Sequence, residues 1–577
     1  MYIDPARYFR HPQLDGQRHY EALRASFLER LPAGIVAQRF SLTPGNVHVL
    51  RHRFLTGKLS FSFRPSDLPG AHRGTPAVVR ARVVELRRQR EMSGGQIAEI
   101  LDEEGVDISV RTVERILRDA GFPRLPRRSR LLIGQTLDRT TVPETSCMLS
   151  IDEMEGTSVS SDLAGVFLFI PFLEQLGLPK LVPRLGLPGS KPIPALQYFL
   201  SFLALKLAGT ERLSHADDHG FDAGLGLFAG LNVLPKCTAM STYAYSLDDS
   251  TVDRIQSGVA SAGHRLGLYT GDTINLDFHA VPHWGEESVL DKNWVGARGK
   301  GIKSALTVFA QDCTSKLILY TQADLRRREA DDQVNEFVAF WKKIAKSVSA
   351  TLVFDSRFTN YRQLAKLDEQ GVRFITLRRR GTKLIHAAEH LPPSAWTRVT
   401  IPHPKRKFQR PIVNESRVRL PGYPTPIRQI IMRDNGHEKP TFLITNDDES
   451  DIDVLVSRYA RRWNIENGLA EAVKFFNLNA LSSSILIKVH FDVVMTMIAD
   501  TLYYLLARRL RGFEECNAPR IFRHFIRGKG QITVGKGEVV VRFPKRAHNP
   551  VLRSMEWTNL PDRVTWLGNR RLRFEWR

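Results

Sequence analysis

The sequence predicts a multidomain α/β protein with a mixed sheet, flanked by helices, in its central part. The N-terminal region twice shows the pattern of three short capped helices. From about residue 269 the apolar spacing changes from helical to alternating, and strands then alternate with helices. With 577 residues, of which 42% are hydrophobic, the chain is long and apolar enough for several buried cores.

The chain is strongly basic, with 83 Lys and Arg against 61 Asp and Glu, a net charge of +22. A field of this sign attracts phosphate backbones, so we expect a polyanionic partner such as DNA; a ribosome or a membrane surface would be alternatives. The four cysteines form no C-x-x-C pair, which favours a reducing cytoplasm over a disulfide framework or zinc ribbon. We expect neither a signal peptide nor a membrane-spanning segment.

Two helix-turn-helix units are predicted at the N-terminus. In the first, Thr43 and Pro44 give the N-cap and first position of a third helix; in the second, Ser93 with Gln96 forms a capping box and Ser109 caps the last helix. Residues 1–130 carry 23 basic and 14 acidic residues, a net +9, which favours DNA over the alternative of protein docking. The basic residues expected in a major groove are Arg51, Arg53, Arg111, Arg115 and Arg118.

The central strands and helices follow a recognisable order. Strands are predicted over Thr273–His279, Ser304–Ala310 and Lys316–Tyr320, then a helix, a fourth strand ending at Asp355, a second helix and a fifth strand. This is the element order of an RNase H-like fold, in which the first and fourth strands are neighbours. We therefore expect Asp277 on the first strand to lie close to Asp355.

A single helix is predicted over Tyr459–Lys474, because the stretch contains strong helix formers and no proline. At about 100° per residue, Tyr459, Arg462, Glu466 and Lys474 lie on one face, with Trp463 beside them. A carboxylate among cations is either an ion-pair network or a metal ligand beside groups that hold phosphates. The pattern resembles the Tyr-Arg-Glu-Lys signature of DDE transposases from bacterial insertion sequences, in the insertion-sequence-four group.

The resemblance implies a role for each matching residue. It makes Glu466 the third metal-binding carboxylate and places Tyr459, Arg462 and Lys474 on transposon-end DNA. Seven residues separate Glu466 from Lys474 where the family has six, which moves the lysine by about 100° around the helix.

Three carboxylates, Asp277, Asp355 and Glu466, would form a hard oxygen site for Mg²⁺ or Mn²⁺. Two such ions would activate the attacking oxygen and stabilise the leaving oxygen in phosphodiester cleavage. A strand Asp can also be a simple hydrogen-bond acceptor, and the topological order of the three favours the metal site.

The segment Gly296–Ser304 resembles a phosphate-binding P-loop, but an extra Ile precedes its Lys-Ser pair and a strand follows it. We therefore expect no nucleotide cofactor, and we expect Arg298, Lys300 and Lys303 to follow DNA phosphates beside the first carboxylate.

A β-rich insert precedes the signature, and such an insert also resembles the insertion-sequence-four group. In relatives an insert Trp holds a flipped base during hairpin formation, and Trp396 is the only Trp of this insert, matched by region. The apolar stretch 485–506 is predicted as a core helix, and the basic tail contains candidate strands for DNA binding or dimerisation.

The predicted segments are 1–60 and 61–130, the two helix-turn-helix units; 131–268, a helical domain; 269–378, the first part of the catalytic core; 379–446, the insert; 447–510, the second part of the core; and 511–577, a basic C-terminal domain. The sequence thus predicts a bacterial DNA transposase that acts on double-stranded transposon ends and target DNA, by a cut-and-paste route, as a homodimer or higher oligomer, in the cytoplasm and nucleoid. The alternatives are a domesticated transposase that only binds DNA, and a structure-specific nuclease or resolvase.

Overall fold

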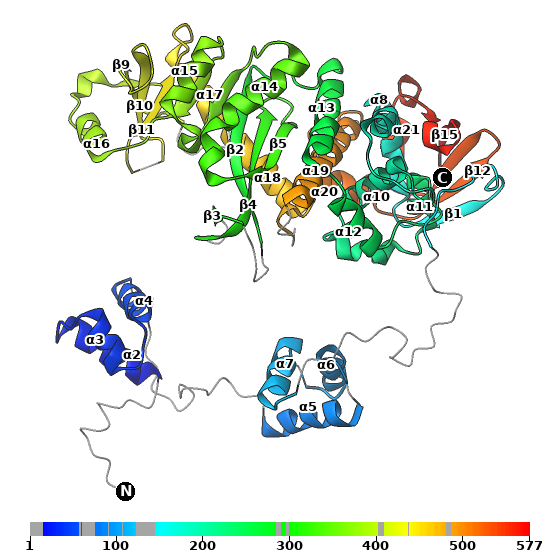
Figure 1. Ribbon diagram of the computed structural model, residues 1–577, viewed down its shortest axis with the longest axis horizontal. Coiled ribbons are helices and arrows are strands. Elements are labelled where there is room, and N and C mark those ends of the chain that lie inside the picture. Colours follow the sequence, from blue (N-terminus) through cyan, green and yellow to red (C-terminus); the bar gives the residue numbers. More distant parts are fainter. Residues whose placement is uncertain are drawn as a thin grey trace. The chain divides into compact units, whose positions relative to one another are not determined.

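The computed structural model describes residues 15–56, 59, 76–90, 92–106, 108–122, 145–283, 290–295, 299–401, 409–436, 438–480 and 486–577. The chain divides into two compact units, Met1–Thr140 and Thr141–Arg577, and each is described by itself (Figure 1). The sequence-predicted segment boundaries remain predictions.

The first three-helix bundle consists of α2 (Asp15–Phe27), α3 (Ala33–Arg39) and α4 (Pro44–Leu55) around a small core of Ala, Val and Phe side chains. The Thr43 side chain accepts a hydrogen bond from the backbone N–H of Asn46, so the predicted cap starts α4.

The second bundle consists of α5 (Ala77–Arg90), α6 (Gly94–Glu103) and α7 (Val110–Asp119) around an Ile, Leu and Val core. Ser93 and Gln96 form the predicted capping box of α6. The helix positions agree with the prediction in both bundles, whereas their role in DNA recognition remains a prediction.

The second unit contains a ten-stranded mixed sheet among its described residues. Its strands are β2 (Thr273–Pro282), β3 (Lys292–Val295), β4 (Lys300–Asp312), β5 (Ile318–Leu325), β6 (Thr351–Phe354), β7 (Phe374–Leu377), β8 (Thr397–Arg398), β9 (Ile412–Val418), β10 (Ile427–Arg433) and β11 (Thr441–Thr445). Its first part has the spatial order β5-β4-β2-β6-β7, in which β2, β6 and β7 are parallel and the other pairs antiparallel. This order is consistent with an RNase H-like fold and confirms that the first and fourth predicted strands are neighbours.

Both faces of this sheet are covered, so every residue of β6 (Thr351–Phe354) is buried. Leu352 and Phe354 of β6 point into a cluster with α14 (Gln333–Ala345) and α15 (Tyr361–Glu369), whereas Val353 joins the opposite cluster with α17 (Ile452–Arg461).

The insert is antiparallel, as predicted, and β11 pairs with β7, so the insert continues the central sheet instead of standing apart (Figure 1). The sequence analysis did not predict α16 (Thr382–Glu389), a short helix that packs with Ile431 and Phe442 of the insert strands.

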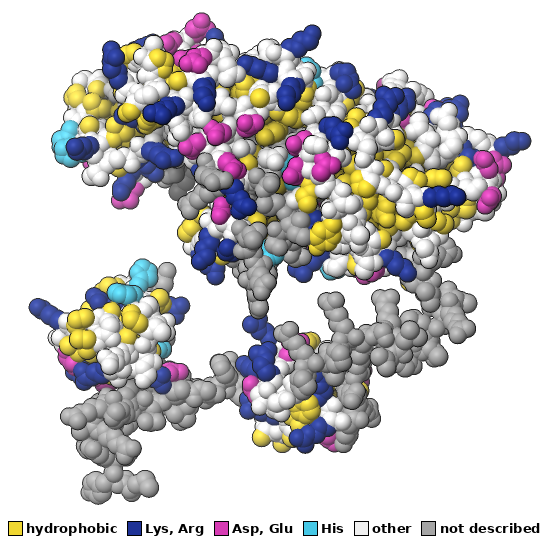
Figure 2. All heavy atoms as spheres, in the orientation of Figure 1, with side chains coloured by type: hydrophobic (Ala, Val, Ile, Leu, Met, Phe, Trp, Pro, Cys, Tyr) yellow, Lys and Arg dark blue, Asp and Glu magenta, His cyan; other side chains and the backbone are white. Residues whose placement is uncertain are grey.

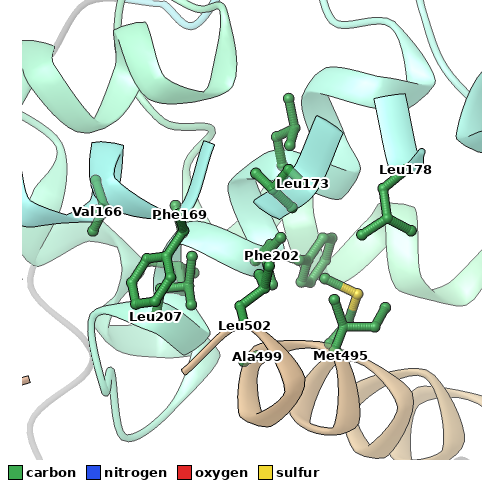
Figure 3. Packing of buried hydrophobic residues seen from close by; sticks show 14 of the residues in the cluster. Val166, Phe169, Leu173, Leu178, Phe202, Leu207, Met495, Ala499 and Leu502 are labelled. Atoms are coloured by element: carbon green, nitrogen blue, oxygen red, sulfur yellow. The ribbon is translucent and has the colours of Figure 1, made fainter. Parts of the chain in front are cut away.

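A helical body surrounds α19 (Leu486–Ala507), the predicted core helix. The surrounding helices are α8 (Ile170–Gln175), α9 (Leu178–Leu181), α10 (Ala195–Leu207), α11 (Ala223–Ala229), α12 (Cys237–Tyr245), α13 (Asp249–Arg265) and α20 (Ala518–Ile521). Figure 3 shows Met495, Ala499 and Leu502 of α19 among Phe and Leu side chains from α8, α9 and α10. By length and composition α19 could cross a membrane, but 83% of its apolar stretch is buried within the protein, which is typical of a core helix.

The C-terminal segment packs on the same apolar cluster as the helical body. Its sheet has the order β1-β12-β13-β15-β14, with β1 (Ser158–Ser161), β12 (Gly530–Gly535), β13 (Glu538–Phe543), β14 (Arg563–Val564) and β15 (Arg570–Trp576); the helix α21 (Asn549–Arg553) lies between β13 and β14 in the chain. The three long C-terminal strands match the sequence prediction. The pairing of β1 with β12 joins residues more than 350 positions apart and was not predicted.

Candidate active site

Two of the predicted carboxylates occupy equivalent positions on neighbouring parallel strands. Leu276 of β2 lies opposite Phe354 of β6, so Asp277 and Asp355 follow at the next step of each strand. Asp277 is still within β2, whereas Asp355 caps the short 3-10 helix η9 (Ser356–Phe358) and accepts the N–H of Arg357 at 2.8 Å. The sheet therefore fixes both positions through its register.

The third carboxylate comes from a helix pair rather than from the single helix predicted over Tyr459–Lys474, and this prediction is wrong. The first helix, α17, ends at Arg461, and α18 (Trp463–Lys474) begins two positions later, after Arg462. Around Arg462 the backbone forms short-range bonds, from Arg462 N–H to the Tyr459 oxygen and from Ile465 N–H to the Arg462 oxygen, each 3.1 Å long. The break lets α17 bury its apolar face against the sheet while α18 buries Ile465 in the cluster around α19.

Arg462, at this break, joins two of the carboxylates. Its Nη1 donates to Oδ2 of Asp277 at 2.8 Å, and its Nη2 donates to Oε1 of Glu466 at 3.0 Å. The Arg462 side chain is only 16% exposed. The guanidinium is thus a partly buried cation fixed between a strand carboxylate and a helix carboxylate.

Burial and neighbouring charges together shift the pKa values of the ionisable groups in this site. Burial raises the pKa of Asp277 to about 6; Arg462 opposes this shift, while the nearby carboxylates Asp355 and Glu466 add to it. Burial alone would lower the pKa of Arg462, but the carboxylate of Asp277 and the other nearby acidic groups raise it overall. The pKa of the Tyr459 hydroxyl is raised, chiefly by burial. Asp355 and Glu466 therefore add to a shift in the pKa of Asp277 that burial dominates.

The donor chemistry fits Mg²⁺ or Mn²⁺, since three carboxylates are hard oxygen ligands. As the side chains lie, no group of three or more His, Cys, Asp or Glu residues is spaced to hold a metal ion within the described part of the chain. Arg462 supplies the compensating positive charge between Asp277 and Glu466 instead. Metal binding by all three carboxylates thus requires this side chain to move.

The other predicted residues of the signature differ in their surroundings. Tyr459 is half-buried beside the sheet cluster that contains α17, and Lys474 is exposed at the last turn of α18.

Of the basic loop, Arg298 lies outside the described residues. Lys303 is six positions along β4 from Phe309, the partner of Asp277, which is roughly 20 Å at the rise of an extended strand. Lys300 lies farther still along β4, at its exposed start. The expected contacts of these two lysines with DNA phosphates remain a prediction.

The predicted residues of the N-terminal bundles are mostly at the surface. Arg53, Arg111 and Arg118 are exposed, and Arg115 is half-buried. Arg51 lies over the Phe27 ring at 5.2 Å and therefore also contributes to packing.

In the insert, Trp396 is half-buried against the α16 cluster, and Arg433 lies over its ring at 5.3 Å.

Arg357 and His279 also lie close to the carboxylates, and the sequence did not indicate the contacts that they make. Arg357, two residues after Asp355, lies over the ring of Phe278, the residue after Asp277, at 4.8 Å. His279 is hydrogen-bonded to Asn479 at 2.8 Å, which links β2 to the segment after α18. Alternation along the first strand placed His279 beside Asp277, but nothing in the sequence indicated its distant partner.

Residues 307–502 match the family model described as the transposase DDE domain. The match supports a DDE transposase. This DDE domain match includes Asp355 and Glu466 and begins after Asp277. It also spans the insert and most of α19, so both parts of the predicted catalytic core lie largely within it.

Two solved structures with weak overall similarity contain Mos1 transposase. One is a pre-cleavage Mos1 transpososome, with 10% identity over 62% of this chain and 77% of that chain and a TM-score of 0.14. The other is a paired-end complex of Mos1 transposase with the left transposon end, with 11% identity over 62% and 76% of the two chains and a TM-score of 0.13. Scores this low carry no structural argument. No curated protein matches the chain.

Figure 2 shows Lys and Arg side chains scattered over the visible face of the second unit, interspersed with Asp and Glu. On this face the basic side chains are therefore not gathered into a single patch.

Proposed function

We propose that this protein is a transposase of the insertion-sequence-four group that binds the ends of its own element and catalyses metal-dependent cleavage and transfer of DNA strands. Asp277, Asp355 and Glu466 are the catalytic carboxylates in this proposal. The N-terminal bundles bind the terminal repeats, and the protein acts on DNA as a dimer or higher oligomer in the bacterial cytoplasm.

The observation that carries the proposal is the convergence of three sequence-distant acidic groups. Asp277 and Asp355 are in register on parallel strands, and Arg462 ties Glu466 to Asp277. A structural ion pair needs one carboxylate for one guanidinium, whereas here Asp355 and Glu466 add to the rise in the pKa of Asp277 that burial causes. Three carboxylates this close together are typical of a site that binds more positive charge than one arginine supplies.

The chain's own residues would position the substrate. When two divalent ions are bound, they activate the attacking oxygen and stabilise the leaving oxygen of the phosphodiester. Arg462, released from the carboxylates, can then grip a phosphate through its two outer nitrogens and orient the scissile bond. Tyr459 lies on the helix turn before Arg462 and can limit where the strand enters.

The test is cleavage of a DNA duplex that contains the inverted repeats flanking the gene. We expect Mg²⁺ or Mn²⁺ to support cleavage at the element ends, and a chelator to stop it. Asp277→Ala should abolish cleavage and retain end binding. Glu369→Ala, an exposed acid at the end of α15, is the matched control and should cleave normally. Specific binding without cleavage by the unaltered protein would favour the domesticated DNA-binding alternative.

A further inference from the structure

A second tryptophan, Trp294, is the most unusual surface residue near the candidate site. It lies on β3, and its side chain is 66% exposed. Single exposed apolar residues are common, so the open ring is informative only together with the groups around it.

Trp294 forms one wall of a cavity of about 330 Å³. The walls come from β3, from the 3-10 helix η8 (Arg327–Asp332), from η9 and from the segment after β7. The residues that line it are Asn293, Trp294, Ala330, Asp331, Arg357 and Arg379. The volume is near the lower end of the range for small-ligand sites, about 300–1,000 Å³.

The polar walls are held by contacts within the protein. Arg357 donates from Nη2 to Oδ1 of Asn293 at 3.1 Å, and Arg379 donates from Nε to the Ser356 backbone oxygen at 3.4 Å. On the opposite wall Asp331 accepts a hydrogen bond from Asn360 at 3.1 Å. Both guanidiniums are therefore positioned before any ligand binds, which lowers the entropy lost on binding.

The cavity wall that contains Arg357 begins directly after Asp355 in the chain. Ser356 and Arg357 directly follow Asp355, and Arg357 lies over Phe278, the neighbour of Asp277. A ligand in the cavity would consequently lie next to the carboxylates.

The lining selects for an anion that also carries a flat ring. Two guanidiniums against one carboxylate favour a phosphate, and the open indole face favours a nucleobase. We propose that the cavity binds one unpaired nucleotide of the DNA strand next to the scissile bond, with its base on Trp294 and its phosphate between Arg357 and Arg379. This assignment rests on the proposed function, which supplies DNA as the substrate.

Trp294 and Trp396 differ in how much of each ring is open to a ligand. Trp396 is half-buried against the α16 cluster and has Arg433 over its ring, whereas Trp294 is mostly open to solvent. An unpaired base should therefore contact Trp294 in preference to Trp396.

Photocrosslinking tests this preference directly. The probe is a short duplex with a single-stranded 3′ overhang that carries one 5-iodo-2′-deoxyuridine, irradiated with the full-length protein in the absence of divalent ions. We expect the adduct on Trp294, its loss in Trp294→Ala and its retention in Trp294→Phe. Phe221→Ala removes an aromatic side chain that is 63% exposed elsewhere, and it should leave the adduct unchanged. Adducts on Trp396 alone, or none in the cavity, would overturn the assignment.

A second test compares the affinities of the protein for two DNA duplexes, one with an overhang and one with blunt ends. The N-terminal bundles contribute equally to both, so their contribution cancels in the ratio. The ratio of affinities for the overhang duplex and a blunt duplex should fall about fivefold to a hundredfold in Trp294→Ala, which is the usual range for loss of one base-aromatic stack. Arg379→Ala should lower the same ratio. An unchanged ratio in both variants contradicts the proposal.

A mononucleotide probe separates the two sources of such a ligand. 5-Iodo-dUMP at the same concentration should label Trp294 much less than the overhang does; equal labelling would mean a site for free nucleotides and would overturn the DNA assignment. Because crosslinking needs no cleavage, an adduct on Trp294 in a protein that cannot cleave would count against the proposed function and not against this site.

Discussion

The third helices of the N-terminal bundles and the candidate active site present arginines in opposite ways. Arg111 and Arg118 of α7 are exposed on a helix whose position depends on local capping and a small core. Arg462 is 16% exposed and bonded to two acids, one of them 185 positions away in the chain. We therefore expect changes in the exposed arginines of α7 to affect DNA binding, and changes in the geometry of Arg462 to affect cleavage. The predictions below test this distinction.

The largest effect is expected from a carboxylate of the sheet. Asp355→Ala should reduce single-turnover cleavage of an element end by at least about a thousandfold, or about 4 kcal/mol in the barrier, because a lost metal ligand cannot be replaced locally. Its affinity for the end should stay nearly unchanged when measured by fluorescence anisotropy. Cleavage at the normal rate would show that Asp355 is not one of the catalytic carboxylates.

Removal of the N-terminal unit should act on binding instead. Deletion of residues 1–140 should reduce the preference for the element end over an unrelated duplex by about a hundredfold or more, since specific recognition typically exceeds non-specific binding by at least a thousandfold. The specific affinity of the full chain should also fall steeply with salt. If the shortened protein keeps the full preference in competition assays, recognition lies in the second unit.

A change of shape at constant charge tests the geometry of Arg462. Arg462→Lys should slow cleavage at saturating DNA about tenfold, or about 1.4 kcal/mol in the barrier, because an ammonium cannot bridge Asp277 and Glu466 or grip a phosphate with two nitrogens. Arg118→Lys on the exposed surface is the matched control and should leave the cleavage rate at saturating DNA unchanged. An unchanged cleavage rate in Arg462→Lys would show that this residue serves only as an ion-pair partner.

The smallest effect is a dependence on pH. The pKa of Asp277 is raised to about 6 by burial, so protons compete with metal ions below that value, and the charged form prevails above it. The apparent affinity for Mn²⁺ should fall about fourfold between pH 7 and pH 5.5, as the ionised fraction of one group with this pKa does. A titration at the two pH values checks this, and equal affinities would contradict the assignment of Asp277 as a ligand.

Features set by short stretches of sequence could be predicted well. The caps at Thr43, Ser93 and Ser109 start the helices that they were expected to start. The order of strands and helices also placed Asp277 beside Asp355, because the parallel pairing of β2 with β6 follows from that order.

Features that depend on packing between distant parts of the chain could not be predicted. The break at Arg462 arises because α17 and α18 bury their apolar sides in different clusters, which no local spacing reveals. The strand that carries Trp294 is only four residues long and pairs with β4, so its pattern is too short to identify. Likewise the pairing of Ser158 with Thr533 depends on the folded core between them.

The most direct test of the catalytic site is metal binding without DNA or cleavage. Electron paramagnetic resonance measures how much Mn²⁺ remains unbound in a titration of the full-length protein. The account predicts bound Mn²⁺ in the unaltered protein and in the exposed-acid control Glu369→Ala, and its loss in Asp277→Ala, Asp355→Ala and Glu466→Ala. Equal binding by the three variants and the control would contradict the claim that these carboxylates form the metal site.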